Sequence, residues 1–96
     1  MICVEIDTER GVLDVSGHAG YAAPNTDIVC AGASALAYAL ARYAGGAEVE
    51  SGHMHISAES MDERMRGAFS CMLMGYELLE EAYPEYVRLV WVNGRG

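Results

Sequence analysis

The feature that most constrains this chain is its hydrophobic period, which switches twice from that of a strand to that of a helix and back within 96 residues. The segment ICVEI alternates, with Ile2, Val4 and Ile6 on one face, and this period of two is typical of a strand. Residues 28–43 instead repeat apolar side chains at steps of three and four, which predicts a helix. Two helices separated by short strands must share one core, because a chain of this length has room for one.

Five strands and two helices are expected along the chain. The strands are predicted at 2–6, 12–17, 47–51, 53–59 and 86–92, and the helices at 28–43 and 60–83. The order ββαββαβ predicts the α/β class. The fold expected is a single-domain, two-layer sandwich over residues 1–96, with two helices packed on one mixed or mostly antiparallel sheet.

The second helix has a start signal and an apolar stripe. Ser60 followed three residues later by Glu63 predicts a capping box. Gly75 in mid-helix indicates close contact with a neighbouring element or a second subunit. The stripe is expected to be core, with a dimer or peptide groove as the alternative. Its members are Met61, Met65, Phe69, Met72 and Tyr76.

The charge balance excludes some partners. There are 14 acidic and 6 basic residues, giving a net charge of −8. Such a chain cannot neutralise a row of phosphates, so no nucleic acid is expected, whereas a basic protein or peptide fits. No apolar run is long enough to span a membrane, and the N-terminal segment lacks the basic start of a signal peptide. A cytoplasmic protein is expected.

Two of the three cysteines, Cys3 and Cys71, and two of the three histidines, His53 and His55, are expected to have no catalytic role. Cys3, Cys30 and Cys71 form an odd set without paired spacing, which favours reduced thiols, with Cys3 and Cys71 in the core. His53 and His55 point to the same side of one strand and could begin a metal site. No third ligand lies at useful spacing, so we expect exposed strand histidines, no metal and no cofactor.

The stretch GHAGYAAPNTDIVC contains the best candidate for chemistry. A helix beginning at residue 27 or 28 places Cys30 in its first turn, where free N–H groups and the helix dipole favour a thiolate and could receive an oxyanion. His18, across the loop, could act as general base. Ser34 lies one turn behind Cys30, and Asp27 could cap the helix or orient the histidine. Spacing alone also allows an ordinary buried cysteine and a hydrogen-bonded loop histidine.

These residues carry a family resemblance. GHAGYA followed by DIVCAGASAL resembles the signature of the ribosomal-processing cysteine proteases, the Prp (YsxB-like) family. The resemblance implies that His18 is the base and Cys30 the nucleophile. It implies supporting roles for Gly17, Asp27 and Ser34.

The resemblance also implies a function. The function implied is that of a cysteine endopeptidase, which removes a short N-terminal extension from a large-subunit ribosomal protein of the L twenty-seven type, or a similar leader, through an acyl-thioester. Members are typically homodimers, and the loop after the histidine, residues 19–26, opens for substrate. Two other classes stay open: a non-catalytic module that binds a basic ribosomal or phage protein, and a redox or metal-binding thiol protein.

Overall fold

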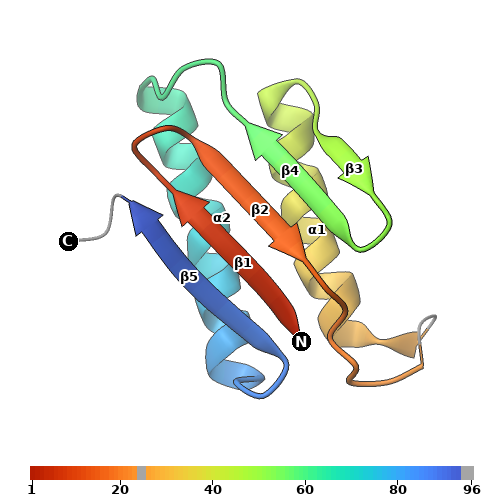
Figure 1. Cartoon of the computed structure of the whole chain (residues 1–96). Coiled ribbons are helices and arrows are strands. Elements are labelled where there is room, and N and C mark those ends of the chain that lie inside the picture. Colours follow the sequence, from red (N-terminus) through yellow and green to blue (C-terminus); the bar gives the residue numbers. More distant parts are fainter. Residues whose placement is uncertain (24–25, 94–96) are drawn as a thin grey trace.

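The computed structural model describes residues 1–23 and 26–93, so part of the expected loop 19–26 lies outside the described residues. Both helices cover the same face of one sheet (Figure 1). This confirms the predicted two-layer sandwich. The elements are β1 (Ile2–Asp7), β2 (Val12–Ser16), α1 (Ile28–Ala44), β3 (Glu48–Glu50), β4 (His53–Ser57), α2 (Glu63–Ala82) and β5 (Val87–Asn93).

The sheet is mixed, with strand order β3-β4-β2-β1-β5. Strands β1 and β5 pair in parallel, whereas β1–β2, β2–β4 and β3–β4 are antiparallel. Ser16 at the end of β2 pairs with His53 at the start of β4. The turn between β3 and β4 therefore lies beside the point where the chain leaves the sheet toward α1.

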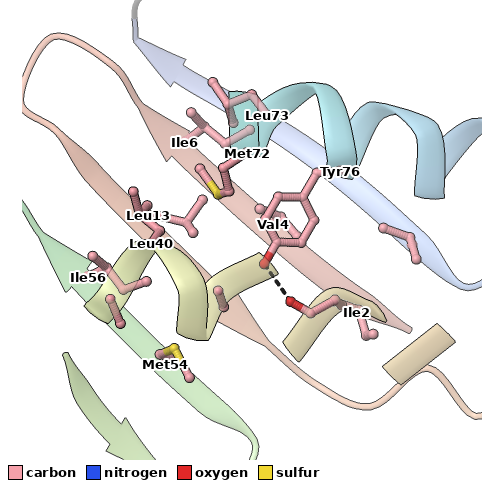
Figure 2. Packing of buried hydrophobic residues seen from close by; sticks show 14 of the residues in the cluster. Ile2, Val4, Ile6, Leu13, Leu40, Met54, Ile56, Met72, Leu73 and Tyr76 are labelled. Carbon is pink, nitrogen blue, oxygen red and sulfur yellow. Dashed lines mark hydrogen bonds between the residues drawn. The ribbon is translucent and has the colours of Figure 1, made fainter. Parts of the chain in front are cut away.

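The core lies between the sheet and the helices (Figure 2). The predicted alternation in β1 is confirmed, since Ile2, Val4 and Ile6 are all buried. Helix α1 contributes alanines at 33, 37 and 41 to this core, which recur about once per turn and are also buried. Small side chains on this face of α1 let its backbone approach the sheet closely.

Helix α2 fixes α1 one turn beyond Cys30. The buried Tyr76 hydroxyl donates to the carbonyl oxygen of Ala33 at 2.8 Å, and burial raises the pKa of that hydroxyl. A Cβ added to Gly75 would lie 2.7 Å from a methyl carbon of Leu36. The close contact predicted for Gly75 is thus confirmed, and its partner is α1 of the same chain.

Two expectations about α2 are wrong. The N-cap is Asp62, whose carboxylate accepts the Met65 N–H at 2.9 Å, so the Ser60–Glu63 capping box does not form. An ionised carboxylate at the cap also interacts favourably with the helix dipole, which a serine does not. Cys71 is exposed rather than in the core. It lies two residues, or roughly 200° around the helix, from the buried Phe69.

The predicted apolar stripe of α2 is core. Its three C-terminal members are buried, and Met65 is partly buried against the same cluster. Met61 is also partly buried there, but it lies before α2, which begins at Glu63 and not at residue 60 as predicted. Among residues 1–23 and 26–93, no helix has the length and apolar character needed to cross a membrane.

Candidate active site

A pocket of about 140 Å³ lies where β2 ends and α1 begins, and the β3–β4 hairpin forms its third wall. Gly17 and His18 line it from the end of β2, and Cys30 and Ser34 line it from α1. Four of the five candidate residues therefore line the same pocket, although a loop separates the first two from the last two in the sequence. The fifth, Asp27, is buried at the helix start and does not line the pocket.

Cys30 is the third residue of α1 and a half-buried free thiol. Its position in the first turn puts the sulfur beside the N-terminal end of α1, the positive end of the helix dipole. Ser34 follows one turn later on the same face, as predicted. The arrangement combines a soft nucleophile with an imidazole across a small pocket, which is suited to acyl transfer.

Asp27 ties the helix start to the loop. Its Oδ1 accepts the Cys30 N–H at 2.9 Å, and its Oδ2 accepts the N–H groups of Tyr21 and Ala22 at 3.0 and 3.3 Å. The bond from the Cys30 amide, aided by the two loop amides, holds the pKa of this carboxyl below its ordinary value. The expected capping role is present. The Cys30 N–H is committed to the cap, so an oxyanion would need other donors while this bond persists.

Gly17 sets the direction in which the chain leaves β2. Its φ is +85°, and an added Cβ would collide with the carbonyl oxygen of Met1, so only glycine fits. The Gly17 N–H donates to the carbonyl oxygen of Gly52 at 2.8 Å. His18 therefore leaves the sheet from a backbone that is fixed on both sides.

The sequence did not reveal the aromatic anchor of the loop. The Tyr21 ring meets the rings of Tyr83 and Tyr86 edge-on, with centroids 5.4 and 5.2 Å apart. These partners follow α2, more than sixty positions away, and no local pattern links them to residue 21. Together with Asp27, they fasten the first half of the loop beside the pocket.

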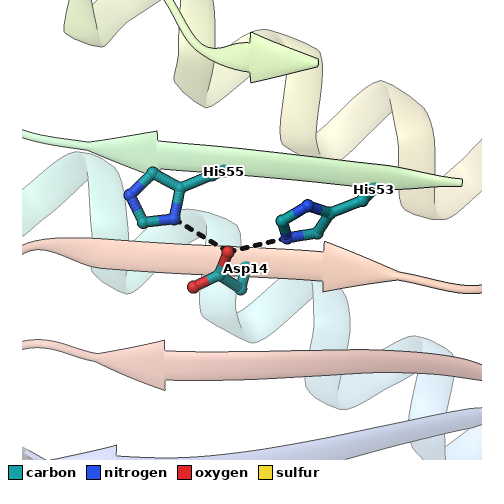
Figure 3. A network of polar contacts seen from close by, with 3 residues as sticks. All are labelled: Asp14, His53 and His55. Atoms are coloured by element: carbon teal, nitrogen blue, oxygen red, sulfur yellow. Dashed lines mark hydrogen bonds and ion pairs between the residues drawn. The ribbon is translucent and has the colours of Figure 1, made fainter. Parts of the chain in front are cut away.

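His53 and His55 have a partner that the sequence did not reveal. Asp14 on β2 lies between them, its Oδ1 2.9 Å from His53 Nε2 and 2.8 Å from His55 Nδ1 (Figure 3). Partial burial alone would raise the pKa of Asp14, but the two hydrogen bonds outweigh it and lower that pKa. Within the described part of the chain, no three such side chains are arranged to hold a metal ion. The cluster links β2 to β4.

A first-turn cysteine and a strand-end histidine thus line one pocket on a small α/β sandwich. The family model described as cysteine protease Prp matches residues 1–88. The chain belongs to this family and is a cysteine protease. This removes the non-catalytic and redox alternatives.

Relatives of known identity agree. The ribosomal processing cysteine protease Prp of Staphylococcus aureus is 34% identical over 93% of this chain and 97% of its own length. The crystal structure of S. aureus Prp with a covalently linked product peptide covers 95% of this chain, with TM-score 0.83 and 28% identity. That chain is covered over 99% of its length. A second S. aureus structure, with a substrate peptide, has TM-score 0.74 at 24% identity and covers 94% of this chain and 96% of its own, which supports the fold.

Proposed function

We propose that the protease removes a short N-terminal extension from a large-subunit ribosomal protein of the L twenty-seven type, with Cys30 as nucleophile and His18 as base. The observation that carries this proposal is the single pocket that both side chains line. The substrate class is supported by the relative in S. aureus, which is named for ribosomal processing. A basic ribosomal protein also suits an acidic enzyme of net charge −8.

The chemistry proceeds in two steps. His18 takes the proton of the Cys30 thiol, and the resulting thiolate attacks the scissile carbonyl carbon. His18 then passes this proton to the leaving amine, so the peptide C–N bond breaks and an acyl-thioester forms. Water, deprotonated by His18, then attacks the thioester and releases the thiol. The covalently linked product peptide on S. aureus Prp supports a covalent route.

Asp27, Gly17 and Ser34 support this pair without reacting. Asp27 aligns the first turn of α1, and Gly17 gives the histidine its direction. Ser34 lines the pocket one turn behind the sulfur, where its hydroxyl can hold substrate or water. Opening of the loop requires the two bonds from Tyr21 and Ala22 to Asp27 to break.

The β3–β4 hairpin is the surface on which we expect the extended leader to lie. Strand β3 is at the sheet edge, all three of its residues are exposed, and Val49 and Glu50 line the pocket. An extended peptide can add to such an edge by backbone hydrogen bonds. Glu48 and Glu50 would favour basic side chains in that peptide.

The decisive experiment compares intact masses of the extended ribosomal protein after incubation with the wild type and with Cys30→Ala. We expect the wild type alone to release an N-terminal peptide. Cys71→Ala is the matched control, because this thiol is exposed on α2, away from the pocket, and its loss should leave the rate within about twofold. Cleavage by the Cys30→Ala variant would contradict the proposed nucleophile, and an intact substrate with every variant would contradict the proposed substrate.

A homodimer and a cytoplasmic location complete the proposal. Exposed apolar side chains on the helices, among them Tyr43, Met74 and Leu78, support self-association. The processing of ribosomal proteins requires the compartment in which they are made. Sedimentation equilibrium tests the dimer, and a single species at monomer mass up to high micromolar concentration would contradict it.

A further inference from the structure

We propose that Gly52, in the turn between β3 and β4, is a positioning residue for the His18 imidazole. The inference rests on the proposed function, because it explains how the base is held. A Cβ added to Gly52 would lie 3.3 Å from His18 Nε2 and 4.0 Å from both Cδ2 and Cε1. The ring therefore turns its Nε2 corner toward the place where a Gly52 Cβ would lie, and a side chain there would have to displace the ring by a few tenths of an ångström.

The backbone of Gly52 cannot easily move away from this contact. Its carbonyl oxygen accepts the Gly17 N–H at 2.8 Å, immediately before His18. The next residue, His53, pairs with Ser16 in the sheet and reaches Asp14 at 2.9 Å (Figure 3). The turn is thus attached to β2 by backbone and side-chain bonds, and β2 is the strand that delivers the base.

The turn geometry alone does not demand glycine. Gly52 has φ +74°, which asparagine also adopts at this position of a two-residue turn. Gly45 likewise has a positive φ, of +95°, yet a Cβ there would meet nothing within 4 Å. Gly52 thus combines the conformational requirement with a contact to the proposed base, and the two can be separated experimentally.

The test compares Gly52→Ala with Gly45→Ala, which imposes similar backbone strain without touching His18. In a Cys3→Ser, Cys71→Ser background, Cys30 is the only thiol, and its alkylation by iodoacetamide is followed by intact mass between pH 5 and 9. His18→Ala is the reference. Iodoacetamide is small, so its reaction reports on the thiol and its base rather than on the fit of a peptide.

We expect the pH profile of alkylation in Gly52→Ala to move toward that of His18→Ala, and the Gly45→Ala profile to match the wild type. For peptide cleavage, Gly52→Ala should lower kcat by about tenfold with KM within about twofold, because a sub-ångström displacement of a catalytic group costs this order of rate. If Gly52→Ala does not fold, Gly52→Asn carries the same Cβ with less backbone strain.

Two outcomes would overturn this inference but leave the proposed function intact. The first is an alkylation profile of Gly52→Ala that matches the wild type while the profile of His18→Ala differs. The second is a raised KM of Gly52→Ala with kcat unchanged. The second would mean that Gly52 shapes only the peptide site. A wild-type profile in His18→Ala would instead refute the proposed Cys30–His18 pair, and the inference would fall with it.

Discussion

Helices α1 and α2 begin with the same capping arrangement, and only α1 begins beside a histidine and under a loop. Asp27 accepts the Cys30 N–H and Asp62 accepts the Met65 N–H, both at 2.9 Å. Asp27 is 7% exposed and also binds two loop amides, whereas Asp62 is exposed. An aspartate cap is therefore present at the start of both helices. What distinguishes α1 is that β2 and the loop after it place a histidine and a pocket beside its first turn.

The largest expected effect comes from moving the thiol between the two helix starts. The double variant Cys30→Ala, Met65→Cys keeps a cysteine at the third helical position but places it on α2. We expect no cleavage, a loss of at least about 10³-fold, since a helix terminus without the base and pocket does not make a protease. Intact-mass cleavage assays measure this, with circular dichroism to confirm folding. Appreciable cleavage would show that the surroundings of α1 are dispensable.

A smaller difference is expected between the caps themselves. Asp62→Ala removes one capping bond and should cost about 1 kcal/mol, a fall in Tm of about 4–8 °C. Asp27→Ala removes the cap and also releases Tyr21 and Ala22, so its fall in Tm should be clearly larger and activity should drop as well. Differential scanning calorimetry and cleavage rates test this. Equal Tm changes would mean that the loop bonds contribute nothing.

The aromatic anchor should contribute to the same loop. Tyr21→Ala removes two edge-on ring contacts, each worth about 0.5–1.5 kcal/mol. We expect a loss of about 1–2 kcal/mol in the free energy of unfolding, and faster proteolytic nicking between residues 18 and 26. Tyr43→Ala, at an exposed tyrosine on α1, is the control. Equal nicking rates in the two variants would argue against an anchor.

The smallest effect concerns pH. Because the folded-state pKa of Asp27 is lowered, its ionised form stabilises the fold fully above its ordinary value of 3.8. That contribution is lost only as pH falls through the lower folded-state pKa. Urea unfolding of the wild type and Asp27→Asn should therefore differ by a constant amount from pH 5 to 7, and converge below pH 3.8. A difference that already shrinks between pH 7 and 5 would contradict this.

Much of this arrangement could be predicted because it is local. Hydrophobic period depends on side chains a few positions apart, so the strands, the helices and the buried stripe of α2 follow from it. The Asp27 cap and the first-turn position of Cys30 are equally local. The cap of α2 was misassigned because Ser60 and Asp62 both suit an N-cap, and only the path of the chain decided between them.

The amino-acid sequence is enough to specify the elements, the position of Cys30 at a helix start and the motif that places the chain among cysteine proteases. The tertiary structure alone decided the strand order, the Asp14 bridge, the aromatic anchor of Tyr21 and the contact between Gly52 and His18. Each of these joins residues from separate elements. Such contacts are fixed by how the sheet and helices pack, because packing brings together groups that no local pattern relates.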